Sequence, residues 1–174
     1  MARNFELTLP SWAFLPDDSA ELVAGDAACG ADSFMGRPVL SFDDTDEEAA
    51  LSTPFEMPSG YTGSGTLKAT CHFFMASDAT NDIALDIFVE AITPNSDTLD
   101  MEAADSWDTA NSGTVSLSGS TAGDLLTLTI TLTNKDSVAA GDLMRLGVRR
   151  DCDSANDDAT GDLYLLGIVL FEEV

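Results

Sequence analysis

The chain has 174 residues, and its 31 acidic residues outnumber its 7 basic residues, which gives a net charge of -24. Because affinity for nucleic acid comes largely from Lys and Arg contacts with phosphates, this balance argues against a nucleic-acid partner. Hydrophobic residues make up 44% of the chain and recur periodically, so the sequence predicts a folded core beneath an acidic surface rather than a disordered chain.

The N-terminal stretch MARNFELTLPSWAF interrupts its apolar residues with Arg3, Glu6 and Pro10. A signal peptide needs an unbroken apolar stretch, and no later run approaches the ~18 apolar residues of a membrane span. We therefore expect a soluble protein that is synthesised in the cytoplasm and has no membrane partner.

Alternating apolar and polar residues predict strands along the chain. In chain order, the expected strands cover residues 4–12, 37–42, 48–58, 65–77, 81–93, 113–119, 124–134, 142–150 and 162–171. The clearest is DLLTLTITLTN, in which Leu126, Leu128, Ile130 and Leu132 alternate with threonines. Turn sequences such as PSGYTGSG, PNSD and GSTAGD separate the strands.

This pattern predicts an all-β protein, an antiparallel β-sandwich of jelly-roll type with about eight strands. A stretch rich in Ala, Gly and Asp, residues 24–36, interrupts the series. We therefore expect two parts: residues 1–36 as an N-terminal strand or arm with its tether, and residues 37–174 as the jelly-roll domain.

The last strand is apolar on both predicted faces: Leu163, Leu165, Val169 and Phe171 alternate with Tyr164, Leu166, Ile168 and Leu170. The outer face of a sandwich strand is normally exposed to solvent. Either the N-terminal segment or another subunit should therefore cover the apolar outer face of this strand. We expect a homotrimer with an apolar seam between subunits. The expected interface residues are Trp12, Phe14, Leu15, Phe74, Phe88, Leu163, Leu165, Val169 and Phe171.

The acidic loop before this strand is a candidate for a calcium site. Calcium binds six to eight oxygen ligands, and the loop offers Asp151, Asp153, Asp157, Asp158 and Asp162. The spacing departs from that of a helix-loop-helix calcium loop, because Ala155 occupies the next ligand position. The alternative is that this loop is a solvent-exposed hairpin tip that binds no metal. Apart from this calcium site, we expect no cofactor.

No catalytic pattern stands out. The single histidine, His72, follows Cys71 in a predicted strand, and neighbouring strand residues point to opposite faces, so these two side chains cannot act together. The three cysteines have long spacings and are interpreted as free thiols. Asp151 and Asp153 should raise the pKa of the Cys152 thiol. We expect a protein that is not an enzyme.

The stretches RPVLSFDD, PSGYTGSGTLKATCHFFMAS, DIFVEAIT and LTITLTNKDSVAAGDLMRLGVRRD, with the final DATGDLYLLGIVLFEE, resemble small jelly-roll proteins that decorate or cement the capsids of tailed bacteriophages. The resemblance covers residues 37–173. It implies a non-enzymatic structural virion protein, often trimeric, that binds the major capsid protein at the virion surface. It assigns no functional residue.

The alternative function is that of a carbohydrate- or receptor-binding β-sandwich module of a phage tail or fibre. Sugar-binding surfaces stack sugar rings on exposed aromatic side chains. Trp107, in the turn-rich stretch ADSWDTANSGT, is the candidate for such a role. A tryptophan that caps the end of the core is the competing interpretation.

Overall fold

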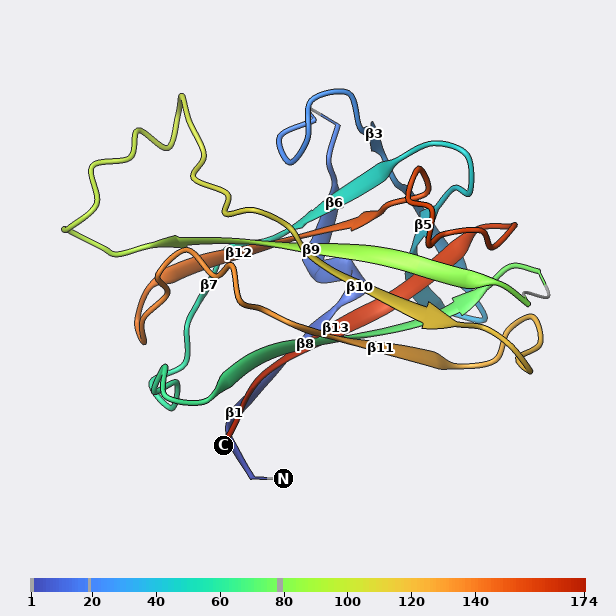
Figure 1. Ribbon diagram of the computed structural model, residues 1–174. Helices are drawn as coiled ribbons and strands as arrows, with labels where there is room; N and C mark the ends of the chain where they lie inside the picture. The colour runs from blue at the N-terminus through green and yellow to red at the C-terminus, as the bar shows by residue number, and fades with distance from the viewer. Residues whose placement is uncertain (1, 19, 78–79) are drawn as a thin grey trace.

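The computed structural model describes residues 2–18, 20–77 and 80–174. Two β-sheets pack face to face, with the hydrophobic core between them (Figure 1). The predicted all-β sandwich is confirmed. None of the described residues belongs to a helix long and apolar enough to cross a membrane.

The sheets are named A and B. Sheet A has the order β11-β8-β13-β5-β4, and β1 also pairs with β13. Sheet B has the order β10-β9-β12-β6-β2, with β3 on β6 and β7 on β12. The first strands are β1 (Arg3–Pro10), β2 (Phe14–Pro16), β3 (Ala27–Ala28), β4 (Gly30–Phe34), β5 (Arg37–Phe42), β6 (Glu48–Ser52) and β7 (Phe55–Glu56). The others are β8 (Thr66–Met75), β9 (Asp82–Ile92), β10 (Asn111–Ser116), β11 (Leu126–Thr131), β12 (Leu143–Arg150) and β13 (Leu163–Glu173). A short 3-10 helix, η1 (Ser11–Ala13), follows β1.

The strand phases predicted for β8 and β11 are confirmed. Along β8, buried and partly exposed residues alternate from Leu67 to Met75. On β11, Leu128 and Ile130 are buried while Thr129 is exposed. The Thr129 and Thr70 hydroxyls lie 2.8 Å apart and form a hydrogen bond on the solvent side of sheet A.

The N-terminal segment is built into the sandwich. β1 pairs with β13 from Arg3 opposite Glu173 to Pro10 opposite Gly167, and β2 pairs with β6. Residues 3–16 therefore contribute a strand to each sheet, so that of the two predicted forms, a strand or an arm, the structure has the strand. The physical reason is the alternation of Phe5, Leu7 and Leu9, which packs against the core and would face water in a free arm.

A β-bulge in β13 changes which of its apolar residues face the core. Its pairing with β8 shifts between Leu165, which lies opposite Phe73, and Gly167, which lies opposite His72. Because the bulge adds one residue, Leu163, Leu165, Ile168 and Leu170 all join the core. The prediction that Leu163 and Leu165 lie on a contact face opposite Ile168 was wrong, because it assumed an unbroken period of two.

Gly167 allows the backbones of β13 and β1 to approach closely at the bulge. A Cβ atom at this position would lie 2.6 Å from the carbonyl oxygen of Leu9 on β1. The close approach of the two backbones therefore requires glycine at this point of β13.

Loops cover much of the outer face of sheet B. Both faces of β9 are buried, including Asp86, Phe88 and Glu90. In the loop after β2, the Asp17 carboxylate accepts hydrogen bonds of 3.0 Å from the backbone N–H groups of Glu21 and Leu22. The Leu22 side chain then lies over Gly147 of β12. Sheet A keeps the more open outer face.

Candidate functional site

Three aromatic side chains gather on the outer face of sheet A: Phe34 from β4, Phe74 from β8 and Tyr164 from β13. The ring centroids lie 4.6 Å apart for Phe34 and Tyr164. They lie 5.1 Å apart for Phe74 and Tyr164, and 5.5 Å apart for Phe34 and Phe74. Phe74 and Tyr164 are directly opposed across the two strands. We call these three residues the aromatic cluster.

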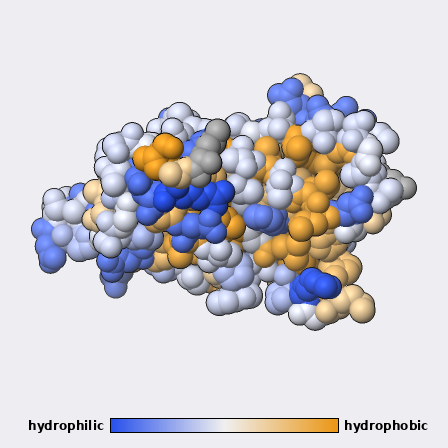
Figure 2. Space-filling model, turned by 90° about the horizontal axis from the view of Figure 1, so that it is seen from below, coloured by the Kyte–Doolittle hydropathy of each residue, from blue (hydrophilic) through white to orange (hydrophobic). Residues whose placement is uncertain are grey.

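The aromatic cluster borders an open hollow of about 410 Å³. The residues that line it are Phe34, Arg37, Phe74, Gly123, Leu125 and Leu166. Figure 2 shows hydrophobic side chains gathered over this side of the molecule. Small-ligand sites commonly occupy ~300 to 1,000 Å³ and are mostly apolar with a few polar groups. The hollow fits that description, and Arg37 supplies the charged group.

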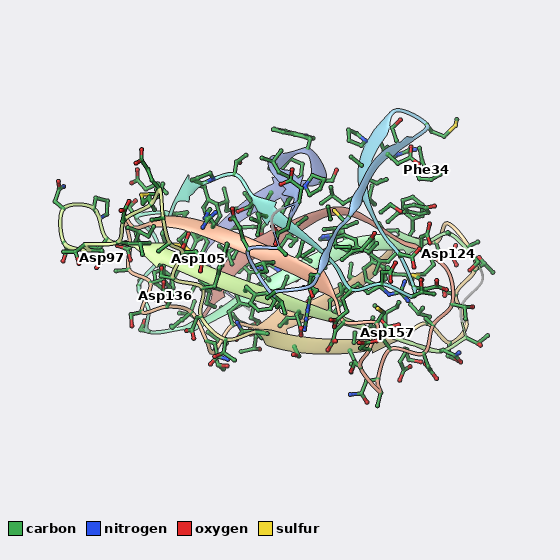
Figure 3. All side chains as sticks on the ribbon, turned by 90° about the horizontal axis from the view of Figure 1, so that it is seen from above. Phe34, Asp97, Asp105, Asp124, Asp136 and Asp157 are labelled. Atoms are coloured by element: carbon green, nitrogen blue, oxygen red, sulfur yellow. The ribbon has the colours of Figure 1, made fainter. Side chains whose placement is uncertain are left out.

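A tight turn holds one wall of the hollow. Met35 and Gly36 connect β4 to β5 with φ angles of +52° and +78°, and two-residue hairpins favour such positive values. Met35 is 94% exposed at the tip, although methionine has no intrinsic preference for this conformation. Figure 3 shows Phe34 on this hairpin, at the end of the sandwich that also carries Asp124 and Asp157. The short hairpin sets the positions of Phe34 and Arg37.

Tyr164 adds a polar group to the aromatic cluster. Its hydroxyl donates a hydrogen bond of 3.5 Å to the Asp162 carboxylate. Burial raises the pKa of Tyr164, and the negative charges of Asp162 and Asp32 raise it further. The phenol therefore stays protonated at neutral pH and remains a hydrogen-bond donor.

The outer face of sheet B carries a layer of ion pairs in place of an open hydrophobic surface. The Arg145 Nε atom lies 2.6 Å from the Glu90 carboxylate, and the Arg149 Nη2 atom lies 2.5 Å from the Asp86 carboxylate. The Arg149 guanidinium also lies 5.8 Å from the ring centroid of Phe88. Phe88 is only 6% exposed, so the prediction that it lies in a subunit interface was wrong.

Trp107 lies under Arg145. The guanidinium carbon is 4.7 Å from the indole ring centroid, and the indole Nε1 atom is buried without a hydrogen-bond partner among the described residues. Arg145 thus covers a ring face that a sugar would need. The structure favours a packed tryptophan over a sugar platform at this residue.

A groove of about 380 Å³ opens beside Arg145, beneath the loop of residues 93–110. Both oxygens of its buried carboxylate, Glu90, are already engaged, one by Arg145 and the other by the backbone N–H of Ser106 at 2.9 Å. Further carboxylates, among them Glu102 and Asp105, also line this groove, so its lining is acidic, whereas the hollow on sheet A is apolar with one basic residue, Arg37.

The acidic loop after β12 is organised around Arg150. Asp157 makes a two-oxygen ion pair with this guanidinium, at 2.9 Å and 3.1 Å, and its side chain is 1% exposed. Asp158 accepts a hydrogen bond of 2.8 Å from the backbone N–H of Asp82. Asp151 lies 3.7 Å from Arg149. Several of the predicted calcium ligands are thus engaged by protein groups.

A different set of carboxylates comes together near this loop. Asp43, Asp44 and Asp162 each offer one oxygen within 4.8 Å of the others. The Asp44 carboxylate accepts a hydrogen bond of 2.5 Å from the backbone N–H of Gly161. Hydrogen bonds from Thr45 lower the pKa of Asp43. Only Asp162 is shared with the sequence-predicted set, because Asp43 and Asp44 arrive from the loop after β5. Calcium binding stays a prediction.

The three thiols are free, as predicted. Burial raises the pKa of the Cys29 and Cys71 thiols to about 12. Burial and then the charge of Asp153 raise the pKa of the Cys152 thiol to about 11. All three are protonated at neutral pH and are therefore weak nucleophiles.

The predicted interface residues divide into two groups. Leu163 and Leu165 are fully buried, and Phe14 is 3% exposed; all three belong to the core. Phe171 lies beneath the Arg3 guanidinium, whose carbon is 3.9 Å from the ring centroid. These four residues were wrongly predicted to lie in a contact surface. Those that keep exposed or partly exposed side chains are Trp12, Leu15, Phe74 and Val169.

Sequence reasoning assigned neither Phe34 nor Arg37 to a site. Both lie at the boundary between the predicted tether and the first predicted strand of the domain. The signal that points to them is the two-residue turn Met35–Gly36 between Phe34 and Arg37, since a glycine in such a turn is typical of a hairpin.

No protein-family model matches the sequence, and no curated protein matches it. The fold is similar to that of a family 28 carbohydrate-binding module specific for non-crystalline cellulose, with a TM-score of 0.48 and 13% identity over 92% of this chain and 87% of that one. It is also similar to the K1 cleaved adhesin domain of Lys-gingipain from Porphyromonas gingivalis, with a TM-score of 0.47 and 10% identity over 98% of this chain and 99% of that one.

A third similar structure is that of the CBM22-1 and GH10 modules of the Clostridium thermocellum N-terminal endo-1,4-beta-D-xylanase 10B, complexed with xylohexaose. The TM-score is 0.47 and the identity is 12% over 99% of this chain. The chain spans 28% of that xylanase chain. At these identities the likeness concerns the fold alone.

Proposed function

We propose that the protein is a non-enzymatic binding module and that its ligand is a carbohydrate held at the aromatic cluster on sheet A. The observation that carries this proposal is the apolar hollow of about 410 Å³ beside Phe34 and Phe74, with Arg37 in its lining. A sugar ring has an apolar C–H face and a rim of oxygen atoms, so it matches a hollow that combines aromatic rings with a strong hydrogen-bond donor.

The surroundings of the aromatic cluster support this proposal over a site at Trp107. Phe34 is 36% exposed and Leu125 is 65% exposed, whereas Arg145 covers the Trp107 ring. The strands β4, β8 and β13 hold the three rings, so the hollow is largely formed before a ligand arrives. A preformed site avoids part of the ordering cost of binding.

A glycan array followed by calorimetry on the best ligand tests the proposal. Phe34→Ala should weaken binding by about tenfold or more, because a packed aromatic anchor commonly contributes ~1 to 3 kcal/mol or more to an interface. Met101→Ala is the matched control, since Met101 is also an exposed apolar residue, at 60%, but lies in the loop beyond sheet B. An array without any bound glycan, or equal loss in both variants, would overturn the proposal.

A second candidate function is the structural virion protein that the sequence resemblance implies. It rests on Trp12 and Leu15, two large apolar side chains that are 71% and 61% exposed on η1 and β2. β2 is an edge strand of sheet B, and edge strands with exposed apolar residues are sites of association. In this candidate function, the segment contacts the major capsid protein or another copy in a homotrimer.

Light scattering at micromolar concentration tests the trimer. The wild-type protein should have three times the monomer mass, and the double variant Trp12→Asp with Leu15→Asp should be a folded monomer. Phe34→Ala should leave the mass unchanged, because Phe34 lies on the other sheet. A wild-type protein that is monomeric would exclude the trimer while leaving the carbohydrate proposal intact.

A further inference from the structure

Arg37 differs from every other lysine and arginine of this chain. Six of the seven Lys and Arg residues have a partner within the protein. These pairs are Arg3 with Glu6, Lys68 with Glu173, Lys135 with the Tyr61 hydroxyl, Arg145 with Glu90, Arg149 with Asp86 and Arg150 with Asp157. Within residues 2–18, 20–77 and 80–174, the Arg37 guanidinium has no ion pair, hydrogen bond or ring contact.

The surroundings make this unpaired charge unusual. The chain has 31 acidic residues, so a basic side chain on its surface readily finds a carboxylate. Arg37 instead lines the hollow with Phe34 and Phe74. It is directly opposed to Phe34 across the hairpin of β4 and β5, and the Met35–Gly36 turn holds the two residues in register. An exposed guanidinium is thus set beside aromatic rings with its five N–H donors unused by the protein.

We propose that Arg37 makes this site selective for a sugar that carries a carboxylate, such as a uronic acid residue. This inference rests on the proposed carbohydrate-binding function. A guanidinium binds a carboxylate through two parallel hydrogen bonds, and the sugar ring that bears the carboxylate packs its C–H face against Phe34 and Phe74. The carboxylate of the ligand then matches Arg37, and the sugar ring matches the aromatic side chains.

The charge of the protein narrows the ligand class. A net charge of -24 repels a densely charged polyanion over a Debye length of ~8 Å at physiological salt. Asp32 and Asp162 add negative charge close to Tyr164. One carboxylate can lie against Arg37 while further anionic groups along the ligand meet repulsion. The site therefore favours an isolated carboxylate over a heavily sulfated chain.

The test compares the methyl glycoside of galacturonic acid, which carries one carboxylate, with its methyl ester, which removes the charge and keeps the ring. Binding to the full chain is measured by calorimetry for the wild-type protein, Arg37→Gln and Phe34→Ala, with melting temperatures as a check of folding. The acid should bind the wild-type protein about tenfold more tightly than the ester, as expected for a charge-assisted hydrogen-bond pair. Arg37→Gln should reduce this ratio to about twofold or less, and Phe34→Ala should weaken both ligands.

The outcomes separate the two proposals. Equal affinity of acid and ester for the wild-type protein, or a preference that survives Arg37→Gln, overturns the role of Arg37 and leaves the carbohydrate site standing. If neither these ligands nor any glycan of the array binds, both proposals fall. A heparin oligosaccharide that binds more tightly than the single-carboxylate ligand galacturonic acid contradicts the selectivity for an isolated carboxylate.

Discussion

Arg150 and Asp157 form a two-oxygen ion pair in which the two side chains are 0% and 1% exposed. The same guanidinium donates hydrogen bonds to the backbone carbonyls of Asp43, Gly161 and Ala159. One buried cation thus ties the acidic loop to the loop after β5. The loop that the sequence suggested as a calcium site is held by an internal positive charge.

Asp157→Asn should lower the free energy of unfolding by ~3 to 5 kcal/mol, because it leaves the Arg150 charge buried without its counterion. Chemical denaturation of the variant measures this loss. Asp153→Asn, at an exposed position in the same loop, is the control and should change stability by less than ~0.5 kcal/mol. Similar effects of the two changes would show that Arg150 does not organise the loop.

Leu128→Ala should cost ~2 to 5 kcal/mol through lost burial and the cavity that it leaves. Thr129→Ala should cost far less, because its side chain is exposed and loses only the hydrogen bond to Thr70. Urea denaturation of both variants provides the comparison. If the threonine change is the more costly one, the strand phase of β11 is wrong.

Leu165→Asp should unfold the protein or make it insoluble, because it puts a carboxylate into the core at a fully buried position. Val169→Asp should leave the fold intact, since the bulge in β13 turns Val169 to the outer, partly exposed face. Circular dichroism and solubility measurements check both. If the Leu165→Asp variant folds but is monomeric where the wild-type protein is oligomeric, the predicted subunit contact at Leu165 would be supported after all.

Glu172 should make stability depend on pH in acid. Its buried carboxylate accepts hydrogen bonds from the Asn4 amide at 2.6 Å and from the backbone N–H groups of Thr62 and Gly65, each at 2.9 Å. Burial by itself would raise the pKa of Glu172, but the hydrogen bonds from Asn4, Thr62 and Gly65 lower it to about 2. A depressed pKa stabilises the fold above the unfolded value near 4.5, and this stabilisation is lost as the pH falls toward 2.

The variant Glu172→Gln removes this titration. Its melting temperature should lie below that of the wild-type protein at pH 7, and the gap should narrow between about pH 4.5 and pH 2. A gap that stays constant across that range would show that the carboxylate does not titrate as its hydrogen bonds predict. Other carboxylates contribute to both proteins alike, so the difference between the two melting curves isolates Glu172.

The pattern of apolar and polar residues was enough to predict the fold class and the phases of β8 and β11. Leu128, Thr129 and Ile130 show why: in a regular strand a period of two decides which side chains face the core. The same rule failed in β13, where one extra residue between Leu165 and Gly167 changes the phase. At this bulge the backbone of β1 lies close to Gly167. No local sequence pattern predicts that contact.

The candidate site depends on long-range packing and could not be predicted from local sequence patterns. Phe34, Phe74 and Tyr164 come from three strands that are distant in the sequence, and the order of strands in sheet A brings their rings together. Composition shows that this chain has few basic residues, but pairing in space decides which of them are neutralised. Arg150 becomes a buried anchor and Arg37 an open charge because long-range packing puts a carboxylate beside the first and an apolar hollow beside the second.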